Sequence, residues 1–347
     1  MSIESLIRRA SAYSMLEKNL YEDRVNVVVV GVGGAGCNAI TRMKKLGLEV
    51  PTIAINTDIN HLSVVEADKK ILLKAGTRGL GSGGQVEIGE KSAIIAREEI
   101  RRLFDGIEIV FIATGLGGGT GTGATPVISD IARREGALVI TILTMPFKVE
   151  RARFQRSREG LKRIMKHSNT VIILENDKLM EIVPNLPINK AFMVMDQLMS
   201  YTIMSFIDMI TKPSLMNVDL SDLRTLMEHG ELSTILIGEG SSTDPRKIVV
   251  DALNRPFVMD MDYSTASGGL IHITAGDSVP LSSVYSAVDA ISSFLKDNSN
   301  IIVGARIAPE FDDRMRILVV LTGIKIPFIQ EERLIEERSR EEIYKIR

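Results

Sequence analysis

Apolar runs rich in β-branched residues recur along the first half of the chain, and stretches with helical spacing, such as residues 89–106, separate them. A continuous apolar run of this kind is typical of a strand buried on both faces of a parallel sheet. The predicted strands are residues 25–31, 50–58, 69–73, 109–114, 136–147 and 170–177. Strands that alternate with helices predict an α/β fold with a doubly wound parallel sheet.

A second series of elements begins at Ser233 and predicts a smaller α+β domain. Its strands are residues 233–240, 268–276, 300–309 and 315–324, with helices at 244–256 and 280–297. The two series are joined by the apolar stretch 191–210, which Pro213 ends. This stretch is about as long as a membrane-spanning helix, roughly 20 residues. Asp196, Gln197 and Asp208 interrupt it, so we expect a core helix between the domains and no direct membrane span.

Composition excludes several classes of partner and cofactor. The net charge of -2 gives no basic excess, so nucleic acid is not an expected partner. A single cysteine, Cys37, excludes an internal disulfide and fits a reducing cytoplasm. The N-terminus lacks the apolar core of a signal peptide. The four histidines have no ligand spacing, so no metal site held by the protein alone is expected.

Three glycine clusters fall where predicted strands end. They are GVGGAG (31–36), TRGLGSGG (77–84) and GLGGGTGTG (115–123), and the last leads into a stretch with helical spacing. Bare backbone N–H groups before a helix N-terminus form a cradle for phosphate. A disordered linker is the alternative for the third cluster, but such linkers join polar segments, and this one follows a buried strand.

The first cluster alone leaves a dinucleotide open as the ligand. GVGGAG fits G-x-G-x-x-G, and Asp58 lies where a Rossmann acid would bind ribose, so an NAD-dependent oxidoreductase is one alternative. Three loops converging on one crevice suit a triphosphate better, since a dinucleotide needs one pyrophosphate cradle. The G-x-x-x-x-G-K-[ST] phosphate loop is absent.

GGGTGTG (117–123) resembles the signature loop of the tubulin/FtsZ family. GVGGAGCNAITRM, AINTD, TRGLGSGG, MPFKVE, END and NVDLSD occur in the family's order between residues 25 and 324. The resemblance is to the FtsZ branch, of the archaeal kind, rather than to eukaryotic tubulin. It implies a GTP-binding domain (25–189), a central helix with a catalytic loop (190–232) and a C-terminal α+β domain (233–325). Helical spacing outside the resemblance predicts an N-terminal helical extension (1–24) and a charged helical tail (326–347).

The resemblance also assigns roles to residues. It gives Glu150 the ribose, Asn176 and Asp196 the guanine, and Phe192 the packing against the base. Many relatives carry an arginine where this chain has Phe154, and the adjacent Arg153 is the expected substitute. The other candidates for cofactor binding are Gly33, Gly34, Ala35, Gly36, Cys37, Asn38, Asp58, Gly81, Gly83, Gly117, Gly118, Gly119, Thr120, Gly121 and Thr122. Asn217, Asp219 and Asp222 match the catalytic loop.

For Cys37 and Asp196, a second interpretation of the sequence stays open. Cys37 begins a helix beside the first cluster, where a lowered thiol pKa is one interpretation and a small packing residue the favoured one. Asp196 could be an aspartate near a helix start that favours the helix dipole.

The resemblance implies a cytoplasmic GTPase that hydrolyses GTP to GDP and phosphate, with Mg²⁺ on the triphosphate. It implies head-to-tail filaments, a site completed by the next subunit, and a role at the division site with membrane-tethering proteins of unknown identity. A filament protein for cell shape or scaffolding stays open as an alternative. Asp219 and Asp222 would orient the attacking water, because an exposed aspartate is a poor base at neutral pH.

Overall fold

A computed structural model describes residues 25–74, 78–212, 219–228, 232–254, 257, 262–296 and 299–325. The predicted N-terminal helical extension, the predicted charged tail and Asn217 lie outside the described residues.

Six parallel strands form the first part of the sheet, in the order β3-β2-β1-β4-β5-β6. They are β1 (Val27–Val32), β2 (Thr52–Asn56), β3 (Lys69–Leu72), β4 (Ile109–Gly115), β5 (Leu138–Met145) and β6 (Thr170–Glu175). Every residue of β1, β2, β5 and β6 is buried, as expected for strands covered on both faces. The predicted doubly wound sheet is confirmed, and its order reverses between β1 and β4, where such folds bind ligands.

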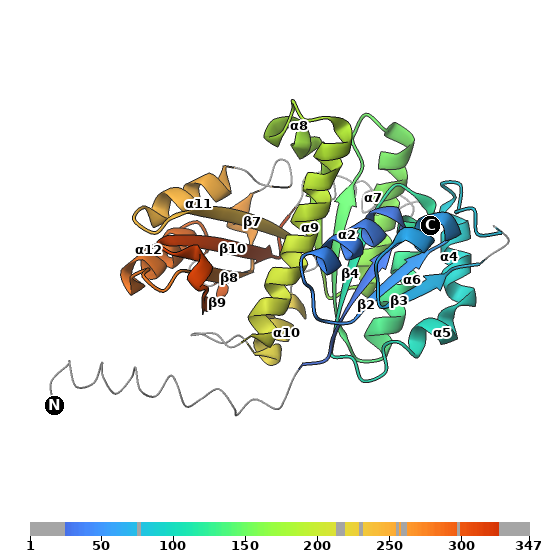
Figure 1. The fold of residues 1–347 in the computed structure, drawn as a ribbon, viewed down its shortest axis with the longest axis horizontal. Coiled ribbons are helices and arrows are strands. Elements are labelled where there is room, and N and C mark those ends of the chain that lie inside the picture. Colours follow the sequence, from blue (N-terminus) through green and yellow to red (C-terminus); the bar gives the residue numbers. More distant parts are fainter. Residues whose placement is uncertain are drawn as a thin grey trace, which may run out of the picture.

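Helices cover both faces of this sheet (Figure 1). On one face, α2 (Gly33–Lys45) and α9 (Ile188–Thr211) pack with Val27, Val29 and Phe111. On the other face, α4 (Val86–Ile95) and α6 (Gly119–Arg134) pack with Val28, Val30 and Ile112. α7 (Arg151–His167) lies beside α6. The short helices α3 (Ile59–Val64), α5 (Arg97–Arg101) and α8 (Leu179–Ile182) connect these elements.

The second series forms the predicted α+β part, but its strands extend the same sheet. It comprises β7 (Leu232–Ser241), α11 (Pro245–Leu253), β8 (Gly268–Ala275), α12 (Leu281–Ser292), β9 (Asn300–Ile307) and β10 (Arg314–Thr322). β10 runs antiparallel to both β7 and β8. The pairs Val171↔Leu232 and Ile172↔Ser233 join β6 to β7 in parallel, so one sheet of 10 strands crosses both parts.

The stretch 89–106 differs from its prediction as one helix. α4 ends at Ile95, a turn at Ala96 follows, and α5 begins at Arg97. Ile95 is exposed, whereas Ile100 and Phe104 are fully buried. The break between α4 and α5 therefore interrupts the helix and allows Ile100 and Phe104 to be buried.

α9 is the central helix predicted between the two parts (Figure 1). It has 24 residues, and Met199, Ile203 and Phe206 belong to the core. Within the described residues, no helix combines the length and apolarity needed to cross a membrane. α8 lies at one end of α9, and α10 (Leu220–Glu228) lies at the other.

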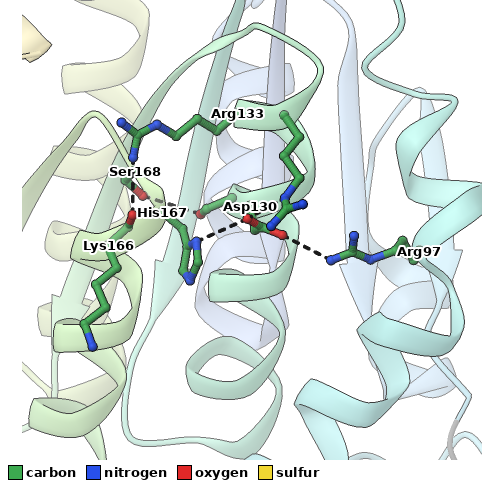
Figure 2. Close-up of polar contacts among 8 residues, drawn as sticks. Arg97, Asp130, Arg133, Lys166, His167 and Ser168 are labelled. Atoms are coloured by element: carbon green, nitrogen blue, oxygen red, sulfur yellow. Dashed lines mark hydrogen bonds and ion pairs between the residues drawn. The ribbon is translucent and has the colours of Figure 1, made fainter.

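The C-terminal end of α6 is held by a charged cluster (Figure 2). Asp130 accepts hydrogen bonds from Arg97 Nη2 at 3.1 Å and Arg134 Nε at 2.9 Å. His167 Nδ1, from α7, lies 3.3 Å from Asp130 Oδ1. These contacts tie α6 to both neighbouring helices, and α6 carries the third glycine cluster at its other end.

Candidate nucleotide-binding site

A cleft of about 390 Å³ opens at the carboxyl ends of the parallel strands. Ligands of doubly wound sheets bind in this position. The cleft brings together many of the residues that the sequence predicts for nucleotide binding. They are Gly34, Ala35, Asp58, Gly81, Gly118, Gly119, Thr120, Gly121, Glu150, Arg153, Asn176, Phe192 and Asp196.

Two helices begin at the cleft with glycine-rich turns. α2 starts at Gly33 directly after β1, and α6 starts at Gly119, four residues after β4 ends at Gly115. The predicted loops are thus shorter than expected, because residues 119–123 are already helical. The first N–H groups of a helix lack partners within it and carry the positive end of the helix dipole. Two such ends facing one cleft favour a polyphosphate ligand.

The glycines of these clusters fall into two kinds. A Cβ at Gly34 or Gly118 would meet no atom within 4 Å, so the backbone is open there. A Cβ at Gly36 would lie 2.1 Å from Ala113 O, and one at Gly119 would lie 2.3 Å from Ser82 Oγ. The first kind can let a ligand approach the backbone, whereas the second permits close packing of α2 on β4 and of α6 on the segment before α4.

Hydroxyl groups line the floor between the clusters. Thr120 Oγ1 lies 2.6 Å from Thr57 Oγ1 and 3.3 Å from Ser82 Oγ. Thr122 acts differently, since it is fully buried and its hydroxyl accepts a hydrogen bond from Gly117 N at 2.9 Å. That bond closes the turn between β4 and α6.

Asp58 lies at the cleft as a helix cap. Its Oδ1 accepts hydrogen bonds from Asn60 N at 2.9 Å and His61 N at 3.1 Å, so it begins α3. Capping α3 uses Oδ1, and Oδ2 is the oxygen left to accept from a ligand.

Glu150 and Arg153 pair at the rim of the cleft. Arg153 Nη1 donates to Glu150 Oε2 at 2.5 Å, and Phe147 N donates to Glu150 Oε1 at 3.2 Å. Phe154 points elsewhere and packs against the core cluster around Leu161. Arg153 therefore is the arginine that lines the cleft near Glu150.

Phe192, Asn176 and Asp196 also line the cleft. Phe192 is 40% exposed and packs edge-on against Phe147, with ring centroids 5.9 Å apart. Asn176 follows β6, and Asp196 lies in the third turn of α9. A helix dipole acts mainly in the first turn, so the dipole does not explain Asp196. Burial raises the pKa of Asp196 to about 6, and the positive charge of Arg42 opposes this rise.

Seven of the residues predicted for nucleotide binding do not line the cleft. Cys37 is buried, and desolvation raises the pKa of its thiol to about 12, so the lowered pKa is wrong and the packing interpretation holds. Asn38 is exposed and its Oδ1 lies 3.0 Å from His61 Nε2. The other five are Gly33, Gly36, Gly83, Gly117 and Thr122.

Asp222 lies on α10, and Asp219 is the residue before α10. Both lie away from the cleft residues. Asp219 Oδ1 accepts hydrogen bonds from Asp222 N and from Ser221 Oγ, both at 2.7 Å. These bonds lower the pKa of Asp219, which makes it a weaker base. Both carboxylates are exposed to solvent.

Several lining residues were missed by sequence reasoning. Asn56, Thr57, His61, Ser82, Gly115, Leu116, Thr144, Pro146 and Met195 complete the cleft. Most follow a strand directly or sit inside a glycine cluster, as Ser82 does. The carboxyl end of each predicted parallel strand was the signal that would have found them. Over the ranges that the structure describes, no group of three or more His, Cys, Asp or Glu side chains is placed to hold a metal.

The fold and the cleft together define an α/β nucleotide-binding protein with two domains. The profile of the Tubulin/FtsZ family GTPase domain matches residues 26–184, and that of the FtsZ family C-terminal domain matches residues 232–325. The chain belongs to the tubulin/FtsZ family, and its first domain is a GTPase domain of that family.

Curated relatives and solved structures agree with this assignment. Cell division protein FtsZ 2 of Methanocaldococcus jannaschii is 40% identical over 99% of this chain and 93% of its own length. Cell division protein FtsZ 1 of Thermococcus kodakarensis is 43% identical over 90% of this chain and 84% of its own length. The structure of an empty FtsZ dimer from M. jannaschii superposes with a TM-score of 0.82 at 40% identity, covering 93% of both chains.

Proposed function

We propose that this chain is a filament-forming GTPase that acts in cell division. Its close relatives are named cell division proteins, and one solved relative is an FtsZ dimer. The observation that carries the proposal is the cleft, which is lined by two glycine-rich helix N-termini together with Phe192 and Asp196. A cytoplasmic location at the division site, with tethering proteins at the membrane, is part of the same proposal.

The choice of guanine follows from hydrogen-bond chemistry at Asp196. Guanine presents two donors side by side, N1–H and the 2-amino group, and a carboxylate accepts both. Adenine presents an acceptor at N1, which would face the carboxylate unfavourably. A mismatch among buried polar groups can discriminate by about 10⁴-fold. Asn176, Phe192 and Glu150 would hold the base and the ribose.

Catalysis in this proposal is positioning and charge stabilisation, as in other phosphoryl transfers. The N–H groups of α2 and α6 would hold the phosphates, and the hydroxyl of Thr120 lies among them. Mg²⁺ would bind through phosphate oxygens, because the described cleft residues offer no ready-made cage, and it would neutralise phosphate charge. Asp219 and Asp222 would orient the attacking water.

Asp196 lies near the start of α9, whereas α10, which Asp219 precedes, lies at the other end of that helix (Figure 1). From Asp196 to the end of α9 at Thr211, the helical rise is about 22 Å at 1.5 Å per residue. We therefore infer that Asp219 reaches the nucleotide of the next subunit. Such a head-to-tail contact joins two different surfaces and propagates into a filament when it does not close.

The test is the dependence of GTPase activity on protein concentration. Specific activity with GTP should rise from near zero in dilute protein to a plateau, and ATP should give little turnover. Full specific activity in dilute monomer would refute the shared site, and equal turnover of ATP would refute the base assignment. A fluorescent fusion imaged in the host during depletion of the native protein separates division from a role in cell shape.

A further inference from the structure

Arg42 is a charged residue of α2 that contacts α9 next to Asp196 in sequence. Its Nη1 donates a hydrogen bond to Gln197 Oε1 at 2.9 Å, and Gln197 directly follows Asp196 on α9. α2 and α9 pack against each other along this contact. The bond therefore holds the guanidinium at α9, one residue along the helix from Asp196, whose charge it influences.

The surroundings of Asp196 disfavour its ionised form, so a nearby positive charge is needed to keep the carboxylate ionised. It is partly buried, and none of the described residues donates a hydrogen bond to its carboxylate. Burial raises its pKa, and Arg42 is the charge that lowers it. Asp58, His61, Glu150 and Arg153 are the other charged or titratable groups lining the cleft.

The charge state of Asp196 decides which base it can read. An ionised carboxylate offers two acceptors to the two donors of guanine. A protonated one turns an O–H donor toward an N–H donor, so one hydrogen bond is lost and two donors oppose each other.

We propose that Arg42 is a specificity-determining positioning residue, which keeps Asp196 ionised and so selects guanine nucleotides near neutral pH. The proposal rests on the assignment of Asp196 to the base. Gln197 holds the guanidinium in place, and Arg42 itself touches no substrate. The helix that presents N–H groups to the phosphates thereby also controls recognition at the base.

The expected effect is a pH-dependent loss of affinity in Arg42→Met. If the midpoint for ionising Asp196 moves up by about one pH unit, the ratio of GDP dissociation constants, variant over wild type, is about 1 at pH 8, about 2 at pH 7 and about 5 at pH 6. Taking the ratio at each pH cancels protonation effects that the two proteins share, such as that of the nucleotide phosphates. A purely structural role for Arg42 would give a ratio that does not change with pH.

The experiment is calorimetric titration of the full chain with GDP from pH 5.5 to 8. Arg42→Lys keeps the charge and should keep the wild-type profile. Lys45→Met removes a positive charge from the same helix, where Lys45 pairs with Glu66 at 3.3 Å, and should leave the profile unchanged. Thermal melting of each variant at each pH establishes that the comparison is between folded proteins, and Arg42→Gln serves as a second uncharged variant.

A ratio that is flat with pH for both Arg42→Met and Arg42→Gln would overturn the inference. Asp196→Ala separates this failure from failure of the site itself. If Asp196→Ala loses the preference for GDP over ADP while the Arg42 variants stay flat, the base assignment stands and the role of Arg42 falls. If Asp196→Ala binds GDP as the wild type does, both the assignment of Asp196 to the base and the role of Arg42 are refuted.

Discussion

Two neighbouring glycines, Gly118 and Gly119, lack a side chain for different reasons. Gly118 precedes α6 in an extended conformation that any residue adopts, and a Cβ there meets nothing within 4 Å. A Cβ at Gly119 would lie 2.4 Å from Gln85 O, inside the contact between α6 and the segment before α4. A side chain added at Gly118 would thus point into open space, whereas one added at Gly119 would clash with protein atoms.

We predict that Gly118→Val keeps the melting temperature and weakens GDP binding about tenfold or more, because the side chain occupies the approach to the backbone. Gly119→Val should be destabilised by about 1–3 kcal/mol through overpacking. Thermal melting and GDP titration of both variants check this. A Gly118→Val protein that binds GDP normally would remove that backbone from the site.

At Asp196 we predict an exchange of base preference. Asp196→Asn keeps the side-chain shape but replaces one acceptor by an NH₂ donor, which now faces the 2-amino group of guanine. GDP affinity should fall on the order of 10²-fold, and xanthosine diphosphate, with an acceptor at that position, should bind better than GDP. Competition binding with both nucleotides measures this. Unchanged GDP affinity would show that Asp196 does not read the base.

Residues of the site were partly predictable from local pattern. Glycine clusters after apolar runs predicted where Gly34 and Gly118 lie, because strand ends and helix starts are local features. The division of the glycines into packing and open positions was not predictable. It depends on atoms distant in sequence, such as Ala113 O opposite Gly36 and Ser82 Oγ opposite Gly119.

Among the elements, the junction of α9 with the second part of the sheet contains a buried histidine. His272 on β8 is 4% exposed, and its Nε2 has no hydrogen-bond partner among the described residues. Near it, Asp208 of α9 pairs with Arg306 of β9 at 2.9 Å and with Lys212 at 2.6 Å. Burial lowers the pKa of His272 to about 4; Asp208 opposes this shift and Arg306 adds to it.

We predict that His272 makes the protein less stable as the pH falls. The unfolded chain protonates this residue below its ordinary pKa of about 6.5, while the folded protein stays neutral until about pH 4. Its contribution to unfolding free energy is therefore complete above pH 6.5 and is lost toward pH 4, by about 3 kcal/mol in total. Denaturant unfolding of wild type and His272→Leu between pH 7 and 4 tests this. Identical slopes in the two proteins would contradict it.

Element boundaries set the limit of sequence prediction. The strands were recognisable because burial on both faces leaves a continuous apolar run, as in β1 and β5. The break at Ala96 was not, since Ala is a good helix former and the turn serves to bury Ile100 and Phe104. The joining of β6 to β7 rests on two residue pairs between segments far apart in the chain, which leave no local signal.

At the scale of the whole molecule, α9 separates the nucleotide-binding cleft from the catalytic residues next to α10, and hydrolysis needs both. Its 24 residues span about 36 Å; Phe192 and Asp196 near its start line the cleft, and α10 lies at its other end (Figure 1). A variant with a blocked cleft still presents Asp219, and a variant without the Asp219 charge still presents a working cleft. Asp219→Asn is a suitable variant without the Asp219 charge. Asn caps helices as well as Asp does, so α10 should still begin at the same residue.

We predict that Gly118→Val and Asp219→Asn, each nearly inactive alone at a GTP concentration too low to fill the weakened cleft of Gly118→Val, recover GTP hydrolysis when mixed. Only interfaces that pair the cleft of Asp219→Asn with the α10 of Gly118→Val are complete, so a random 1:1 polymer should reach about a quarter of wild-type specific activity. Phosphate release measures recovery, and co-sedimentation measures whether both variants enter the polymer. An inactive polymer that contains both variants would contradict the shared site, since every part needed would then be present at its interfaces. Recovery that appears only above the concentration at which polymer forms would tie hydrolysis to the contact between subunits rather than to either subunit alone.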